Sequence, residues 1–272
     1  MGDVEAGVQS MAEAALGTPR AQLVQYEELR DTSEDYLTPR VGTPIRMLND
    51  SLLGGMYGVF VVGGTAGVGK SAFALLTAVD AAHRGMQVIY LAGEMSKTQI
   101  MARSKWLCSK RFYDWEGVHE NLHVVIVPGS YPVQHILAWP QSIAPGCERM
   151  LIVWDSFNAI TEAVAASEQI GYFRAADILR SLIVSSRMGS EGAIASLVIS
   201  ELNQDGSTKG RNWEYKSDGI VYFKQEYEYD DGRFSVKLVK SRERSTGRYD
   251  LGSYFVLAGD VLFPLAEIGG AA

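Results

Sequence analysis

One eight-residue segment constrains this chain more than any other feature of its sequence. It fits the pattern G-x-x-x-x-G-K-[ST] and consists of Gly64, Thr65, Ala66, Gly67, Val68, Gly69, Lys70 and Ser71. The apolar run Val59–Val62 before it is typical of a buried strand, and the Ala- and Leu-rich stretch Ser71–His83 after it is typical of a helix. A strand, a glycine-rich turn and a helix in this order predict a phosphate-binding loop.

The residue types of this segment suit a nucleotide triphosphate. Glycines let the backbone curl so that successive N–H groups point at phosphate oxygens, and the helix adds the positive end of its dipole. We expect the whole segment to bind ATP, with Lys70 on the β- and γ-phosphates and Ser71 as a ligand of Mg²⁺. The alternative is a glycine-rich turn that binds nothing.

Two acidic residues follow other apolar runs and complete the expected site. Asp155 ends the run Leu151–Trp154, where a carboxylate beside a phosphate loop would order Mg²⁺ through water. Glu94 follows the run Gln87–Leu91 and could polarise the attacking water. Each has a structural alternative, since Asp155 could cap a helix and Glu94 could be a favourable charge at a helix N-terminus.

Strand and helix signals alternate along most of the chain, beginning with Thr43-Pro44, an N-cap followed by proline that predicts the start of a short helix. This alternation, with entirely apolar strands, predicts an α/β fold with a mainly parallel central sheet flanked by helices. The tail differs, because the strand signals at 220–223, 234–239 and 254–257 are separated only by turns, which predicts an antiparallel C-terminal extension of the sheet. We place residues 1–40 in an N-terminal extension or linker and residues 41–272 in the core.

Composition narrows the possible environments and partners. No apolar run reaches the roughly 18 residues of a spanning helix, and the first 16 residues lack the pattern of a secretion signal. We therefore expect a soluble cytoplasmic protein that makes no contact with a membrane. Cys108 and Cys147 are too isolated for a zinc site or a disulfide framework and are read as buried free thiols. The net charge of −7 argues against non-specific coating of duplex DNA by a monomer, but it leaves room for a ring with a basic pore.

Several motifs together resemble a known family. The segment 48–56 (LNDSLLGGM), the phosphate loop and the Gly-Glu-Met-Ser run at 93–96 are similar to RecA-superfamily ATPases of the DnaB, RadA/Sms and KaiC branches. The stretch 201–211 and the strand after it resemble RadA/Sms, and Lys240-Ser241-Arg242 followed by Ser245-Thr246-Gly247 resembles a segment of replicative helicases. The match covers about residues 41–260.

The resemblance implies roles that spacing alone does not give. A glutamate at the position of Glu94 is catalytic in these relatives, and the ATP site lies between subunits of a ring, expected to be a hexamer, or of a filament. Lys240 and Arg242 would then reach the γ-phosphate bound by a neighbour, and Lys209 and Arg211 would contact single-stranded DNA in a central channel. The alternatives are charges on a solvated edge strand and a hydrophilic loop. Glu201 departs from the Gln or His that relatives often carry to sense the γ-phosphate.

Three functions fit these motifs to different degrees. The first is an oligomeric, DNA-stimulated ATPase, such as a helicase, a translocase or an accessory protein of recombination or replication. The second is a KaiC-like regulatory or scaffold ATPase that binds proteins instead of DNA. The third is a small-molecule kinase, which lacks support because no segment supplies the arginine-bearing lid of such enzymes. The first two share every catalytic residue, so the motifs do not separate them.

Overall fold

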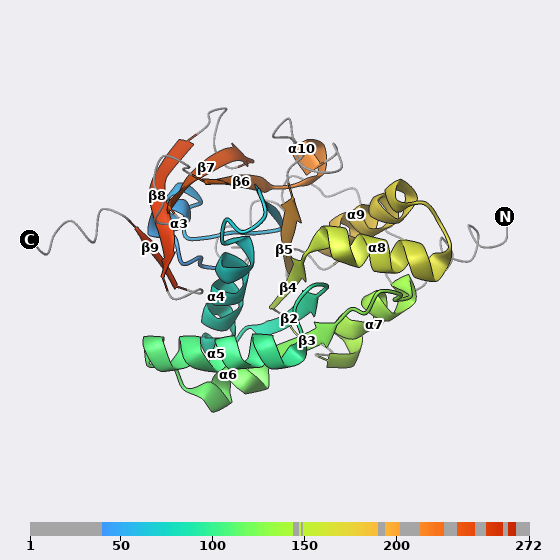
Figure 1. The fold of residues 1–272 in the computed structure, drawn as a ribbon, viewed down its shortest axis with the longest axis horizontal. Helices are drawn as coiled ribbons and strands as arrows, with labels where there is room; N and C mark the ends of the chain where they lie inside the picture. The colour runs from blue at the N-terminus through green and yellow to red at the C-terminus, as the bar shows by residue number, and fades with distance from the viewer. Residues whose placement is uncertain are drawn as a thin grey trace, which may run out of the picture.

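The computed structural model describes residues 40–143, 147, 149–189, 194–201, 213–225, 233–242, 249–257 and 261–264. Within them, nine strands form one sheet in the order β3-β2-β4-β5-β1-β6-β7-β8-β9 (Figure 1). The strands are β1 (Val59–Gly64), β2 (Gln87–Ala92), β3 (Leu122–Ile126), β4 (Met150–Asp155), β5 (Ile194–Glu201), β6 (Gly219–Gln225), β7 (Arg233–Ser241), β8 (Tyr249–Leu257) and β9 (Val261–Pro264).

The sheet has a parallel part and an antiparallel part. Every pair from β3 to β6 is parallel, whereas β6–β7, β7–β8 and β8–β9 are antiparallel. The carboxyl ends of β1, β2, β4 and β5 therefore meet at one edge of the sheet, which is where open α/β sheets bind ligands. The predicted parallel sheet and its antiparallel C-terminal extension are both present, and β9 is an addition that the sequence analysis did not anticipate.

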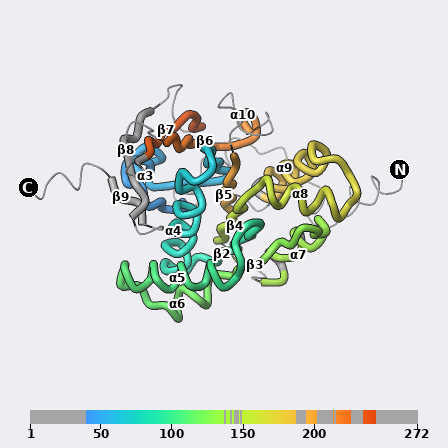
Figure 2. The backbone as a smooth tube through the Cα atoms, in the orientation of Figure 1, coloured from blue at the N-terminus to red at the C-terminus, as the bar shows by residue number. Residues whose placement is uncertain are grey.

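Helices cover both faces of the sheet. The helices are α3 (Arg46–Ser51), α4 (Lys70–His83), α5 (Lys97–Arg111), α6 (Trp115–Asn121), α7 (Val133–Ile143), α8 (Phe157–Glu168), α9 (Tyr172–Gly189) and α10 (Trp213–Lys216). Apolar residues of α4, α5 and α6 form one core with the sheet, and those of α7, α8 and α9 form a second core on the other side. Figures 1 and 2 show the two groups of helices on opposite sides of the central strands.

The two cores explain why the strands are so apolar. Successive side chains of a strand point to opposite faces, so a strand covered on both faces must be apolar at every position. In β1 and β4 all six residues are buried. Phe60 and Val62 of β1 pack into the core with α4, while Val59 and Val61 pack into the core with α8 and α9. The two-sided apolar packing fixes β1 in the sheet, and with it the start of the phosphate loop.

Some local predictions differ from the structure. Thr43-Pro44 was expected to start a helix, but α3 begins at Arg46, and the N–H of Thr43 donates to Asn49 Oδ1 at 2.8 Å. Cys108 is buried as predicted, whereas Cys147 is only half-buried, and both are free thiols. Residues 1–39 of the predicted N-terminal extension lie outside the described residues. None of the described helices combines the length and the apolar character needed to span a bilayer.

Candidate active site

The predicted phosphate loop joins β1 to α4. Gly64 is the last residue of β1 and Lys70 is the first residue of α4. Gly69 precedes the helix with a φ of 92°, a left-handed conformation that glycine adopts without steric cost. Thr65, Ala66 and Gly67 are exposed at the tip of the loop, while Val68 is buried in the core beneath it. The chain thus forms the strand–loop–helix unit that the eight-residue pattern predicts.

The side chain of Lys70 lies inside the curve of this loop. Its ammonium donates to the carbonyl oxygens of Gly64 at 2.9 Å and of Thr65 at 2.6 Å. Burial lowers the pKa of Lys70, and the negative charges of Glu201, Asp155 and Glu94 oppose that shift. Carboxylates at or just beyond the ends of three strands therefore act electrostatically on the ammonium of Lys70.

Ser71 and Asp155 lie together beneath the loop. The hydroxyl of Ser71 donates to Asp155 Oδ1 at 2.9 Å, and the phenol of Tyr90 donates to Asp155 Oδ2 at 2.5 Å. Burial raises the pKa of Asp155, and the hydrogen bonds from Tyr90 and Ser71 partly offset this by lowering the same pKa. Tyr90 and Asp155 belong to neighbouring strands, so the parallel pairing of β2 with β4 places the two groups side by side.

These oxygen atoms fit a magnesium ion. Mg²⁺ prefers hard oxygen ligands and is usually held by one or two protein groups together with substrate phosphates and water. Ser71 Oγ and Asp155 supply such oxygens next to the phosphate loop. Among the described residues, no three His, Cys, Asp or Glu side chains gather closely enough to hold a metal by themselves.

Glu94 lies next to the end of β4. It follows Gly93, whose N–H donates to the carbonyl of Asp155 at 2.7 Å. Its carboxylate accepts a hydrogen bond from the hydroxyl of Ser156 at 2.5 Å, and the side chain is otherwise exposed. The structure thus brings Glu94 to the same edge as Lys70, Ser71 and Asp155.

Glu201 occupies the end of β5, directly beside Gly64 in the parallel pairing of β1 with β5. Its backbone N–H donates to Asn158 Oδ1 at 3.4 Å, so the end of β5 is attached to α8. Glu201 is the first of the three carboxylates that raise the pKa of Lys70. An acidic group next to the phosphate loop is unusual for a residue that would sense a phosphate, because like charges repel.

Lys240 and Arg242 lie far from this edge. Lys240 donates to the carbonyl of Ser217 at 2.6 Å, and Arg242 pairs with Asp218 at 3.3 Å. Asp218 also accepts the N–H of Val59, the first residue of β1, at 2.8 Å. The length of β1 from Val59 to Gly64, roughly 16 Å at about 3.3 Å per residue, separates the two basic groups from the phosphate loop. Lys209 and Arg211, the predicted DNA contacts, lie outside the described residues.

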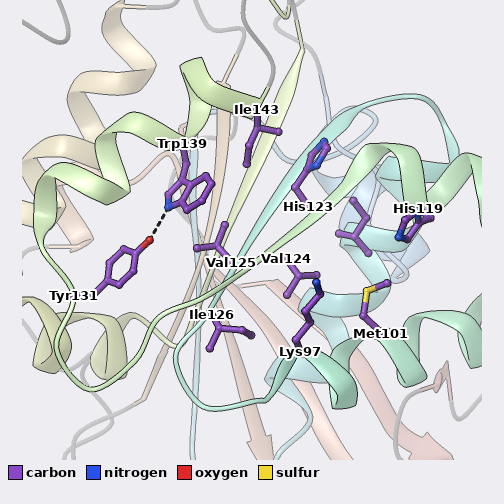
Figure 3. Close-up of a pocket in the computed structure, with 11 residues that line it drawn as sticks. Lys97, Met101, His119, His123, Val124, Val125, Ile126, Tyr131, Trp139 and Ile143 are labelled. Carbon is purple, nitrogen blue, oxygen red and sulfur yellow. Dashed lines mark hydrogen bonds between the residues drawn. The ribbon is translucent and has the colours of Figure 1, made fainter.

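A separate pocket of about 460 Å³ lies along β3, the edge strand of the sheet (Figure 3). Lys97 and Met101 line it from α5, and Trp139 lines it from α7, where the indole N–H donates to the hydroxyl of Tyr131 at 2.8 Å. No residue of the phosphate loop lines this pocket. The predicted phosphate-binding residues therefore lie outside this pocket.

The chain is similar in sequence to DNA repair proteins named RadA. The DNA repair protein RadA of Brucella abortus (strain 2308) is 26% identical over 225 residues, which cover 81% of this chain and 44% of RadA. The RadA of Mycolicibacterium smegmatis (strain ATCC 700084 / mc(2)155) is 25% identical over 209 residues, with coverages of 75% and 40%. The chain thus spans less than half the length of these relatives. No protein-family model matches the sequence.

The fold has a clear structural counterpart. A KaiC-like protein from the hyperthermophilic archaeon Pyrococcus horikoshii OT3 superposes with a TM-score of 0.62 at 17% identity, covering 84% of this chain and 100% of that chain. The chain has the fold of the RecA-superfamily P-loop ATPases. The RecA-like fold expected from the motifs is confirmed, with its parallel sheet and antiparallel strands at one edge.

Three polar residues of this RecA-like site were not predicted from the sequence. Tyr90 lies within an apolar strand, and nothing in that run distinguishes its hydroxyl from a core group. Ser156 and Asn158 follow Asp155, where their residue types indicate only a helix N-terminus. Their contacts depend on strand neighbours distant in sequence, so only the folded chain reveals them.

Proposed function

We propose that the chain binds ATP with Mg²⁺ and hydrolyses it, and that it works as an oligomer on DNA. One observation carries the hydrolytic part of this proposal: Lys70, Ser71, Asp155 and Glu94 come from three strand ends and meet at one edge of the sheet. If Asp155 were only a helix cap, or Glu94 only a surface charge, neither would need to lie close to the other proposed catalytic groups. Together they match the parts of a phosphoryl-transfer site, which binds phosphates, holds Mg²⁺ and orients the attacking group.

Each group has a distinct task in this proposal. The loop N–H groups and Lys70 bind the β- and γ-phosphates and neutralise the charge that develops on them. Ser71 and Asp155 hold Mg²⁺, which supplies further positive charge when bound. Glu94 orients a water molecule for attack on the γ-phosphorus and accepts its proton. The exposure of Glu94 suits this task, because its carboxylate must reach solvent-derived water.

We further propose that the site is completed by a neighbouring subunit. Lys240 and Arg242 lie at the opposite end of β1 from the phosphate loop of their own chain. Lys240 and Arg242 can therefore contact a nucleotide only if that nucleotide is bound by another subunit. A ring, such as a hexamer, or a filament would bring Lys240 and Arg242 of one subunit to the γ-phosphate of the next.

Action on DNA is supported by the likeness to RadA, a protein named for DNA repair. In this proposal Lys209 and Arg211 contact the phosphates of a single strand. The likeness to a KaiC-like protein and the net charge of −7 favour a second function, a regulatory ATPase whose partners are proteins. The two functions differ in one measurable respect, which is the response of the ATPase to DNA.

The first experiment measures ATP hydrolysis by the purified chain with Mg²⁺, with and without single-stranded DNA. Lys70→Ala should abolish nucleotide binding or turnover, and Glu94→Gln should keep binding but lower kcat by about 10²-fold or more. Glu116→Gln is the matched control, since Glu116 is an exposed glutamate in the first turn of α6 and should be neutral. Hydrolysis that survives in the Glu94→Gln variant at the wild-type rate refutes the proposed role of Glu94.

The response to DNA separates the two functions. If DNA is the client, single-stranded DNA stimulates hydrolysis, and Lys209→Ala with Arg211→Ala weakens salt-sensitive binding. Lys105→Ala, on α5, should leave DNA binding unchanged. If single-stranded DNA neither stimulates ATP hydrolysis nor binds in a salt-sensitive way, the DNA function is refuted and the regulatory function remains.

The shared site is tested by mixing two inactive variants. Arg242→Ala spoils one side of a subunit interface and Lys70→Ala spoils the other, so mixed assemblies should regain part of the activity. Arg46→Ala removes a different, solvent-exposed ion pair, with Asp50, and should be active by itself. Confirmed mixed assembly without any recovery of activity contradicts the role of Arg242 across the interface.

A further inference from the structure

The hydroxyl of Ser156 makes a hydrogen bond to Glu94 that has no part in the roles proposed above. Ser156 follows Asp155 at the end of β4, is only 4% exposed and precedes the first residue of α8. Its oxygen accepts the N–H of Ala159 at 3.4 Å, which caps the helix. Its proton goes to Glu94 Oε1, with an oxygen–oxygen distance of 2.5 Å. One buried hydroxyl therefore joins the N-terminus of α8 to the exposed carboxylate of Glu94.

We propose that Ser156 is a positioning residue that holds the carboxylate of Glu94 for the attack of water. This inference rests on the proposed hydrolytic role of Glu94. A glutamate in solvent samples several rotamers, and fixing one carboxylate oxygen removes most of that freedom. The hydroxyl holds Oε1, so the other oxygen of the carboxylate stays available to the water molecule. A hydrogen bond to a carboxylate is stronger than one between neutral groups.

The backbone around Ser156 keeps the two groups together. The N–H of Gly93 donates to the carbonyl of Asp155 at 2.7 Å, so the residues just before Glu94 and Ser156 are joined. A Cβ at Gly93 would lie 2.7 Å from the Cβ of Ala159, closer than side-chain atoms approach in proteins. The end of β2 therefore passes directly over the first turn of α8. This close approach is what lets the short side chain of Ser156 reach Glu94.

A role limited to capping α8 makes different predictions. A cap contributes to the stability of the helix, and its loss changes the melting temperature without selecting one kinetic constant. A positioning role affects the chemical step, so its loss lowers kcat and leaves the KM for ATP nearly unchanged. The side-chain hydrogen bonds of Ser156 within the described part of the chain go to Glu94 and Ala159, and neither partner belongs to the phosphate loop.

Three substitutions separate these roles in the full-length chain. Ser156→Ala loses both bonds, and we expect kcat to fall by about 10- to 100-fold, as for one hydrogen bond to a charged group. Ser156→Asp keeps a good cap but has no proton to donate and repels Glu94, so kcat should fall at least as far while the fold is kept. Ser156→Thr keeps both bonds and should restore kcat to within about threefold of wild type. In Ser156→Ala and Ser156→Thr, which add no charge beside Asp155, the KM for ATP should stay within about twofold.

The matched control is Asp114→Ala, which removes the side-chain cap of α6 away from the site. It should lower the melting temperature and leave kcat unchanged. Wild-type kcat in both Ser156→Ala and Ser156→Asp, or a parallel rise in the KM of Ser156→Ala, overturns the proposal for Ser156 alone. Failure of Ser156→Thr to recover kcat counts against it as well. A wild-type chain without any ATPase activity would instead refute the proposed function itself.

Discussion

The hydrogen bond from Tyr90 to Asp155 allows a quantitative prediction. Tyr90 is fully buried and Asp155 is 4% exposed, so no water replaces the phenol when Tyr90→Phe removes it. The carboxylate then loses a bond of the charged kind, which contributes about 1.5–3 kcal/mol. Because ~1 kcal/mol shifts the melting temperature of a chain of this size by ~2–4 °C, Tyr90→Phe should melt roughly 3–12 °C lower.

The pH dependence of this effect has a defined sign. Burial raises the pKa of Asp155, and the phenol bond favours its ionised form. The stabilisation from the bond is therefore present above the folded pKa of Asp155 and is lost as the pH falls through it. The difference between wild type and Tyr90→Phe in free energy of unfolding, measured by urea titration without nucleotide, should shrink on acidification.

Tyr113→Phe is a matched control for Tyr90→Phe. The phenol of Tyr113 also donates to a carboxylate, that of Asp80, at 3.0 Å, but Tyr113 is half-buried and Arg111 lies 3.9 Å from the same carboxylate. Since Asp80 keeps this partner, Tyr113→Phe should cost only about 0.5–1.5 kcal/mol. If Tyr90→Phe is no less stable than Tyr113→Phe at neutral pH, the reasoning about the buried bond is refuted.

Further predictions concern Asp155 and two glycines. Because the pKa of Asp155 is raised, its contribution to the free energy of unfolding falls as the pH rises from 3.8 through the folded pKa. Asp155→Asn should therefore gain stability relative to wild type above that range, and it should lose Mg²⁺-dependent turnover. Equal pH profiles of the two proteins in urea titrations would contradict this. A Cβ at Gly64 would lie 2.6 Å from the carbonyl oxygen of Phe223, a backbone atom, so Gly64→Ala should cost about 1–3 kcal/mol and weaken binding of a fluorescent ATP analogue. At Gly219 the added Cβ would lie 2.0 Å from the ring of Phe60, and Gly219→Ala should lower the melting temperature without reducing the affinity for that analogue once folded.

The sequence predicts those parts of the fold that depend on local signals. The phosphate loop, its flanking strand and helix, and the apolar runs that become β2, β4 and β5 all carry their information in consecutive residues. Parallel pairing then follows from the alternation of strands and helices, which brings Glu94 and Asp155 to one edge without further information. Local signals alone therefore place Lys70, Ser71, Glu94 and Asp155 at one edge of the sheet.

Other features depend on contacts between distant residues. Tyr90 is an ordinary member of an apolar strand until β4 places Asp155 beside it. The helix expected at Thr43-Pro44 begins only at Arg46, and before it the side chain of Asn49 accepts the N–H of Thr43 while the hydroxyl of Thr43 accepts the N–H of Ile45. The position of Arg242 beside Asp218 requires the antiparallel register of β6 and β7. No local pattern contains that register.

The central position of β1 has a consequence for the exchange of amide hydrogens. Its N–H groups lie between β5 and β6, under helices on both faces, whereas β3 has a neighbour on one side only within the described sheet. Amides so enclosed exchange with deuterium only when much of the sheet separates, and amides of an edge strand exchange through smaller openings. The strand leading into the phosphate loop should therefore be among the slowest regions to take up deuterium. The loop is anchored to the part of the molecule that opens last.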